Sequence, residues 1–528
     1  MMREIPAPEQ TLSKLKKRIK PQWVWAFWGT VLPGLLVHFY RMANYIQVDD
    51  SPYFTFNEQN TSYLGRWLLQ WAGSISSYME IPALNAWLSL LYLGVFAVVF
   101  VEVLRVETPL LCGVIGGCLA VLPAFTTTLL FAYAADPYML ALVLAGAAVL
   151  AACKLPGWKG VAAGAVLLCL SMAVYQAYLD VAVLLCLLVC FSASLRNGAR
   201  AALPAAGRMA LMGAAGVLAY MGSAKLMLQL QGLSASDYGG FSSMGELDPA
   251  GSLRVLKELY FGSAHVFMDK LFYATSLPWQ LLGWGILGLM ALLAAALIVK
   301  SGKERGLTGA AALAAHWAAA GIWLLLLPAG ATALAILQPG NFPYNSLNGF
   351  ANGLVVVIPL VFVDWLRPSR LNLVQLTRWV TLGAVLLMSW HFILVANQSM
   401  RLLQVIQERD MANANRVLAR MEVQEGYSIH TKVYFAGKAV ETASNTPLME
   451  YGNKLSRNIR GLHTDSLLFG DNAYHVFMND NFGTNFAYAS AEEQEAILQS
   501  NEYAAMPVWP AEGCVRMFGD VLVVRLYE

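Results

Sequence analysis

Charged side chains are scarce in this chain. Asp, Glu, Lys and Arg make up 13% of its 528 residues, about half the share found in soluble domains. Hydrophobic residues make up 58%, and many of them fall in runs long enough to cross a lipid bilayer. The net charge is only +2, which gives no indication of nucleic-acid binding. The scarcity of charge and the apolar runs predict a polytopic membrane protein.

Several motifs of soluble enzymes and metal sites are also missing. The chain has no HExxH, CxxC or Walker motif, and no glycine-rich loop in the setting of a dinucleotide site. Six of its seven cysteines fall in apolar segments, and Cys514 stands alone in a polar region. We expect the six to act as small apolar residues. The start, MMREIPAPEQTLSKLKKRIK, lacks the pattern of a signal peptide, because its basic stretch is long and no cleavage site follows a short apolar run.

Apolar runs of about 20 residues, the length that crosses a bilayer, recur over the first 400 residues. We predict about eleven spans, near residues 22–40, 83–104, 109–131, 137–153, 161–178, 180–195, 209–227, 276–299, 308–328, 348–366 and 379–397. The stretch 161–195 fits either a helical pair or one bent element. The stretch 228–275 has room for re-entrant or interfacial helices.

The distribution of Lys and Arg predicts the orientation, because these residues are retained on the cytoplasmic side. With the N-terminal tail inside, the inner segments carry 18 Lys and Arg and the outer loops carry six. We therefore predict a basic cytoplasmic tail over 1–21 and a transmembrane domain over 22–397. An odd number of spans leaves the C-terminal region outside.

The composition changes after residue 398. Residues 401–426 have helical spacing with mixed charges, and TKVYFAG and DVLVVRLYE have the pattern of short strands. We predict a small α/β domain over 398–528 on the extracytoplasmic side, long enough to bury its own core. The fold class is therefore an all-α polytopic membrane protein with a small α/β C-terminal domain.

Two adjacent acids stand in the first outer loop, in the stretch YIQVDDSPYFTF. Asp49 and Asp50 are either solvated loop residues or the acid/base centre of an enzyme. A carboxylate there can take a proton from an attacking hydroxyl. Both acids also offer hard oxygen ligands for a divalent metal, although neighbouring side chains diverge and need not share one ion. The sequence indicates no other cofactor.

A cation follows in the same loop. The fragment LGRWLLQW predicts an amphipathic interfacial helix, because Trp67 and Trp71 are interfacial anchors. Such a helix brings Arg66 to headgroup depth, where a guanidinium can hold a phosphate bidentately. The simpler interpretation is that Arg66 only reaches toward anionic lipid.

Three further groups of candidate residues lie at predicted outer helix ends. Asp136, in FAYAADPYML, is either a second acid at the same cavity mouth or an N-cap with Pro137 at the first helical position. In VYQAYLD, the side chains able to hydrogen-bond a sugar or a phosphate can equally form an aromatic belt; they are Tyr175, Gln176 and Tyr178. A basic interfacial helix in the loop 228–275 carries Arg254 and Lys257, which suit contact with a lipid phosphate.

VDDSPYF, GRWLLQW, ADPYMLALVL and YQAYLD together resemble the bacterial type II O-antigen glucosyltransferases. These serotype-converting proteins belong to the C-type, polyprenyl-dependent glycosyltransferases, and the resemblance covers roughly residues 20–400. It implies an inner-membrane enzyme that moves a hexose such as glucose from undecaprenyl phosphate to a surface glycan, lipid-linked or on lipopolysaccharide, at the periplasmic face. It also implies two partner proteins, a small flippase and a polyprenyl-phosphate sugar synthase. The family's acid in the first outer loop maps to Asp49 or Asp50, with Asp136 as an auxiliary acid.

Two other functions compete with this interpretation. A lipid-linked glycan polymerase or ligase is expected to have arginine-rich outer loops, whereas these loops hold six Lys and Arg and begin with paired acids. A flippase or transporter is expected to have ionisable residues at mid-membrane and repeated halves. The spans here are nearly free of charge and show no inverted repeat.

Overall fold

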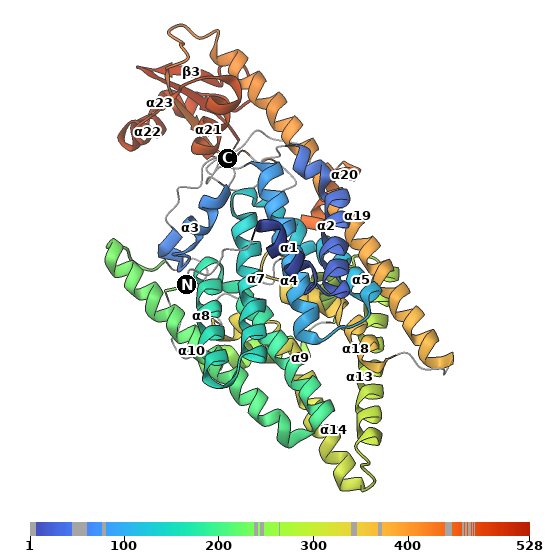
Figure 1. Cartoon of the computed structure of the whole chain (residues 1–528). Coiled ribbons are helices and arrows are strands. Elements are labelled where there is room, and N and C mark those ends of the chain that lie inside the picture. The colour runs from blue at the N-terminus through green and yellow to red at the C-terminus, as the bar shows by residue number, and fades with distance from the viewer. Residues whose placement is uncertain are drawn as a thin grey trace. The chain divides into compact units, whose positions relative to one another are not determined.

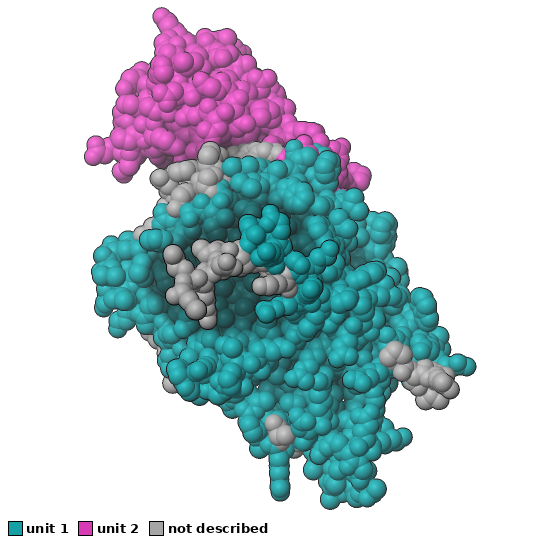
Figure 2. All heavy atoms as spheres, in the orientation of Figure 1, with its two compact units in different colours: residues 1–43, 57–396 teal, residues 44–56, 397–528 magenta. Residues whose placement is uncertain are grey.

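The computed structural model describes residues 7–44, 61–76, 81–236, 241–242, 248–262, 264–338, 346–367, 372–438, 446–456, 459, 462, 466, 468 and 470–527. The described chain is mostly helical, with a small sheet near its C-terminus (Figure 1). It divides into two compact units, and the second holds residues 397–528 (Figure 2).

The first unit is built of helices. Its long helices are α2 (Pro21–Ala43), α4 (Pro82–Leu104), α7 (Ala132–Lys154), α8 (Gly157–Val174), α9 (Leu179–Asn197), α10 (Ala199–Gln231), α13 (Leu277–Glu304) and α14 (Ala310–Leu325). Its shorter elements are α1 (Pro8–Lys16), η2 (Thr61–Leu64), α3 (Leu69–Gly73), η3 (Ser74–Ser76), α5 (Pro109–Val121), α6 (Pro123–Leu130), η4 (Gln176–Tyr178), α11 (Pro249–Phe261), α12 (Ala264–Phe272), α15 (Leu327–Gly330), α16 (Ala333–Leu337), α17 (Phe350–Gly353), η7 (Leu354–Val356) and α18 (Ile358–Leu366).

Eight helices of the described chain are long and apolar enough to cross a membrane, and the bent pair α5–α6 raises the number to nine. The predicted count of eleven is therefore not confirmed. The predicted span 22–40 forms α2, but this helix is too polar to meet the same test. The predicted span 348–366 is broken into α17, η7 and α18. The stretch 228–275 does contain helices, α11 and α12.

Helices α4 and α7 run in the same direction and fix the two ends of the bundle. Near their starts, Asn85 of α4 donates to Asp136 of α7 over 2.9 Å. Near their ends, Lys154 of α7 is ion-paired with Glu102 of α4 over 2.6 Å. Asp136 and Lys154 are separated by about 27 Å, because a helix rises about 1.5 Å per residue. Groups at the two ends of these helices thus belong to distinct sites.

Close backbone contact joins α2 to α5. A Cβ atom on Gly116 would lie 2.4 Å from the carbonyl oxygen of Ala26, and one on Gly29 would lie 2.4 Å from that of Gly113. Small residues at such crossings allow helix backbones to approach closely in membranes. The glycines therefore fix the packing of α2 on its neighbour.

Helix α19 (Asn372–Met421) runs without a break from the first unit into the second. The second unit adds β1 (Lys432–Ala436), α20 (Pro447–Ser456), α21 (Gly470–Phe482), β2 (Ala487–Tyr488), α22 (Ala491–Leu498), α23 (Asn501–Ala505), β3 (Val515–Phe518) and β4 (Val521–Arg525). The sheet order is β2-β1-β4-β3, in which β1 is parallel to β2 and β4, and β3 is antiparallel to β4.

The sheet of the second unit is buried on both faces. Val433 and Phe435 pack with residues of α19 and α21, whereas Tyr434 packs with Ile497 of α22 and Tyr503 of α23. The predicted strands at both ends of this region are thus confirmed. Cys514 is fully buried in the first of these cores rather than isolated in a polar stretch, and all seven cysteines are free.

Candidate functional site

The sequence directs attention to the end of the bundle where α4 and α7 begin. The paired acids Asp49 and Asp50 lie outside the described residues, so their role stays a prediction. The described groups at this end come from the segment after η2 and from α2, α4, α7, α8, η4 and α10.

A tight turn positions Arg66. Gly65 precedes it with φ +77°, a conformation that glycine adopts without strain. A Cβ atom there would lie 2.4 Å from Tyr220 Oη and 2.8 Å from Gln176 Nε2. The backbone amide of Leu68 then donates to the carbonyl of Ala173 over 3.0 Å, which fastens the segment to the end of α8. The predicted amphipathic helix does not extend over LGRWLLQW. Helix α3 has only five residues and begins at Leu69, after Arg66.

The Arg66 guanidinium contacts two tyrosines. Its Nη1 donates to Tyr138 Oη over 3.0 Å, and its central carbon lies 5.0 Å from the centroid of the Tyr175 ring. The two tyrosine rings stack with centroids 4.0 Å apart. A cation over an aromatic face is held by the ring quadrupole. These contacts orient the Arg66 side chain against the protein. The simpler interpretation, that Arg66 only reaches toward anionic lipid, does not account for them.

The predicted sugar- or phosphate-binding side chains form the wall beside Arg66. Tyr175, Gln176 and Tyr178 are all buried, so the alternative of a lipid-facing aromatic belt is wrong. The Tyr175 hydroxyl donates to Asn348 Oδ1. Gln176 Nε2 donates to the Leu64 carbonyl over 2.7 Å and to Tyr220 Oη over 2.9 Å. Gln176 thus ties the end of α8 to the segment that carries Arg66.

Asp136 is a buried acid on the same helix as Tyr138. Helix α7 begins at Ala132 and contains Pro137, so the alternative of an N-cap at Asp136 is wrong. Asp136 is 1% exposed, and its Oδ1 accepts from Asn85 Nδ2 over 2.9 Å. Among the described residues its buried Oδ2 has no hydrogen-bond partner, although the Ser76 hydroxyl, which donates to the Gly73 carbonyl, lies near this carboxylate. A buried carboxylate oxygen without a partner is costly, and such a group is a candidate for contact with a ligand.

Sequence reasoning missed several residues that complete this arrangement. Arg41 of α2 is buried, and its Nε donates to the Leu129 carbonyl over 3.0 Å at the end of α6. Three more side chains bind the predicted residues by hydrogen bonds: Asn85 binds Asp136, Tyr138 binds Arg66, and Tyr220 binds Gln176. A single polar residue within an apolar helix forms no motif with its neighbours in sequence. Its polarity was the only signal that could have indicated a functional role.

Arg254 and Lys257 are exposed on α11, where Ser252 Oγ donates to the Ile336 carbonyl over 2.8 Å. No hydrogen bond in the described residues connects either cation to Arg66. Their role in phosphate binding remains a prediction.

The described residues offer no metal site. Within the described ranges, no group of three or more His, Cys, Asp or Glu could hold a metal ion. The prediction that Asp49 and Asp50 can bind a divalent metal concerns residues outside those ranges. The described residues at this end of the bundle offer one guanidinium able to bind a phosphate, aromatic rings, hydrogen-bonding side chains and one buried acid.

Comparison with known proteins gives one match. A family model described as glucosyl transferase GtrII matches residues 39–363, more than half of the chain. The match covers every described residue named above for this end of the bundle. The comparisons with curated proteins and with solved structures find no match.

Proposed function

Because this chain belongs to the GtrII glucosyl transferase family, as its motifs predicted, we propose that it moves a hexose from a polyprenyl phosphate to a surface glycan. The family description indicates that this hexose is glucose. The family assignment makes it a glycosyltransferase, and its apolar helices are those of a membrane-embedded protein. The donor, the acceptor and the periplasmic location of the reaction are the proposed parts.

The observation that carries the proposal is the setting of Arg66. A guanidinium offers several donors in a planar fork that matches a phosphate. Tyr138 and Tyr175 orient it at the helix end where the buried acid Asp136 also lies. A cation held by hydrogen-bonding tyrosines, at the same helix end as a buried acid, suits a ligand that is both phosphate and sugar.

The proposed reaction needs three groups. The acceptor hydroxyl attacks C1 of the donor sugar, the bond from C1 to the phosphate oxygen breaks, and the hydroxyl proton passes to a carboxylate. General-base help of this kind is worth about 10²–10⁴-fold in rate. Arg66 stabilises the charge that develops on the leaving phosphate. Asp49 or Asp50 is the proposed base, and Asp136 is the auxiliary acid whose second oxygen is left for the substrate.

The orientation of the chain supports a periplasmic reaction. Cations gather where α4 and α7 end, at Arg105 and Lys154, and the candidate site lies where these helices begin. Because Lys and Arg are retained in the cytoplasm, this distribution supports an outer-side position for Arg66. A donor at that side has to be carried across the membrane on a lipid, and a polyprenyl phosphate meets this requirement.

The test substitutes Asp136→Asn, which keeps the shape and removes the acid. We expect transfer from a labelled polyprenyl-phosphate hexose, measured in membranes, to fall by about 10²-fold or more at an unchanged protein level. The matched control is Asp480→Asn, an exposed aspartate of the second unit, which should leave transfer intact. Mass analysis of the surface glycan with and without the protein identifies the sugar added.

Two results would count against the proposal. Full transfer by Asp136→Asn together with full transfer by a double Asp49→Asn, Asp50→Asn variant would remove the proposed acids from the reaction. Loss of glycan export instead of loss of the added hexose would identify a transporter.

A further inference from the structure

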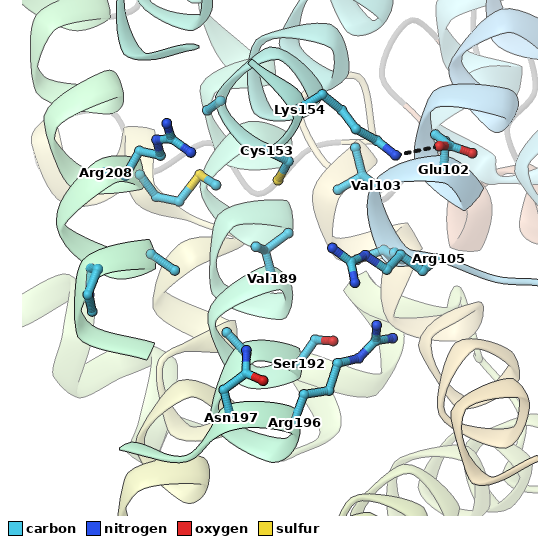
Figure 3. Close-up of a pocket in the computed structure, with 16 residues that line it drawn as sticks. Glu102, Val103, Arg105, Cys153, Lys154, Val189, Ser192, Arg196, Asn197 and Arg208 are labelled. Carbon is cyan, nitrogen blue, oxygen red and sulfur yellow. Dashed lines mark hydrogen bonds and ion pairs between the residues drawn. The ribbon is translucent and has the colours of Figure 1, made fainter. Parts of the chain in front are cut away.

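A second polar region lies at the opposite end of α4 and α7 from Arg66. A cavity of about 400 Å³ opens between the ends of α4, α7 and α9 and the first turns of α10. Arg105, Lys154, Arg196 and Arg208 line it, with Glu102 as its one acid (Figure 3). A neighbouring cavity of about 450 Å³ shares Arg105 and Arg196; its other charged residues are the cations Lys300, Arg305 and Arg367 and the acids Glu107, Glu304 and Asp364. Positive charge thus exceeds negative charge around both.

The one acid of the first cavity is already engaged. Glu102 accepts from Lys154 over 2.6 Å, from Lys20 over 2.8 Å and from Trp23 Nε1 over 3.0 Å. Figure 3 shows the Lys154 ammonium directed at Glu102, whereas the Arg105 and Arg196 side chains lie below this pair in the view. Glu102 is therefore engaged with Lys154, Lys20 and Trp23 rather than with these two arginines.

Arg105 and Arg196 come from different helices and repel one another. Arg196 also lies close enough to Arg367 for their like charges to interact, with only Glu107 opposing them. Among the described residues, no ion pair is formed by Arg105, Arg196 or Arg367. The excess of positive charge around both cavities indicates a site for an anion, because an anion removes the repulsion between the arginines.

The backbone at two of these arginines is also unusual. Arg105 has φ +53°, and Arg367 has φ +59° with ψ 154°. The second conformation is adopted almost only by glycine, and backbone strain in a side-chain-bearing residue is typical of ligand sites. Two of the three non-glycine residues with positive φ in the described chain therefore line this region.

We propose that Arg105 and Arg196 bind a phosphate group at this end of the bundle, separate from the candidate transfer site. Arginine forks match phosphate oxygens bidentately. Apolar side chains line the same cavity between the helices, among them Val103, Val189 and Met209. A phosphate attached to an apolar group fits this combination, and basic pockets between membrane helices are known to take lipid headgroups. An inorganic phosphate shares the recognised chemistry.

A simpler explanation is that these arginines only mark the cytoplasmic side and balance helix C-terminal dipoles. That explanation treats every cation at this end alike. Arg200 and Lys303 lie in the same connections, are exposed, and line neither cavity. They therefore provide a matched control.

The test measures arginine modification by phenylglyoxal, site by site, in full-length protein reconstituted in nanodiscs. One arm uses neutral phosphatidylcholine, a second adds phosphatidylglycerol, and a third adds inorganic phosphate to the neutral discs. We expect phosphatidylglycerol to slow modification of Arg105 and Arg196 by about tenfold or more, with Arg200 little changed. Protection by inorganic phosphate as well would identify a small-anion site.

A second measurement uses variants. Lipid retained on the protein is counted by native mass spectrometry for Arg105→Gln with Arg196→Gln, and for the control Arg200→Gln with Lys303→Gln. The first pair should lose bound phosphatidylglycerol or phosphate, and the second pair should keep it. Equal protection of Arg200 in the first experiment, or no protection of Arg105 and Arg196 by either anion, overturns the proposal even if the variants fail to fold.

Discussion

At the residue scale, Arg66 is held by its shape as well as by its charge. Its guanidinium donates to Tyr138 and lies over the ring of Tyr175, and a lysine ammonium can reproduce neither the planar fork nor the stacking. Gly65 and Gln176 fix the backbone on which Arg66 sits. A change that keeps the charge therefore separates geometry from simple attraction.

We expect Arg66→Lys to raise the KM for a polyprenyl-phosphate donor by about tenfold or more, because one charge-assisted bond and its orientation are lost. The measurement is initial transfer rate in membranes with the donor varied. Arg401→Lys, on the exposed surface of α19, is the control. A KM for Arg66→Lys equal to that of the control would show that Arg66 does not bind the donor.

The position of a polar residue at a helix end was predictable where it lies within a recognisable motif. The stretch YQAYLD correctly indicated polar side chains at a helix end, since α8 ends at Val174 and the next residues are buried and hydrogen-bonded. The sequence could not predict that Tyr175 stacks on Tyr138. That contact depends on how α7 packs on α8, which a single sequence does not specify.

At the scale of elements, the α2–α5 contact shows how little space these helices leave. Gly116 has the carbonyl of Ala26 and the side chain of Thr30 within 2.6 Å of where a Cβ would stand. Even one methyl group has to displace backbone. By contrast, a Cβ on Gly213 of α10 would meet nothing within 4 Å.

These two glycines give a matched pair of substitutions. Gly116→Ala should destabilise the protein by about 1–3 kcal/mol through overpacking, whereas Gly213→Ala should be neutral or slightly stabilising, because alanine favours helix. The measurement is the thermal midpoint of purified protein in detergent. A midpoint for Gly116→Ala equal to that for Gly213→Ala would contradict the close approach of α2 and α5.

Element positions followed from the apolar runs, but their breaks did not. The sequence predicted helix α4 to within a residue and strands β1 and β4. It did not predict that residues 348–366 divide into three short pieces, or that α5 and α6 bend by 45° at Pro123. Hydropathy averages over a window, so it is blind to a local break that neighbouring helices stabilise.

At the scale of the whole molecule, α4 and α7 separate two chemically different ends. One end holds Arg66, Asp136 and the tyrosines, and the other holds the arginine-lined cavities. The distribution of Lys and Arg could be read from the sequence alone. The grouping of Arg105 with Arg196 could not, because it depends on where α4 and α9 end in space.

This polarity predicts the sidedness of the chain in the membrane. A green fluorescent protein fused after Lys154 should fluoresce, because the end of α7 is expected in the cytoplasm. An alkaline phosphatase fused after Gln231, at the end of α10, should be active because it reaches the periplasm. The opposite pattern in both fusions would place the Arg66 end in the cytoplasm and exclude a periplasmic reaction.

The bond from Arg41 to the end of α6 bears on how the protein is made. A helix with a buried arginine inserts poorly by itself, and α6 ends with carbonyls that lipid cannot satisfy. The bond from Arg41 to Leu129 gives the guanidinium of α2 an acceptor and the carbonyl at the end of α6 a donor. We therefore expect stable integration of α2 to require the segment that ends at Leu130.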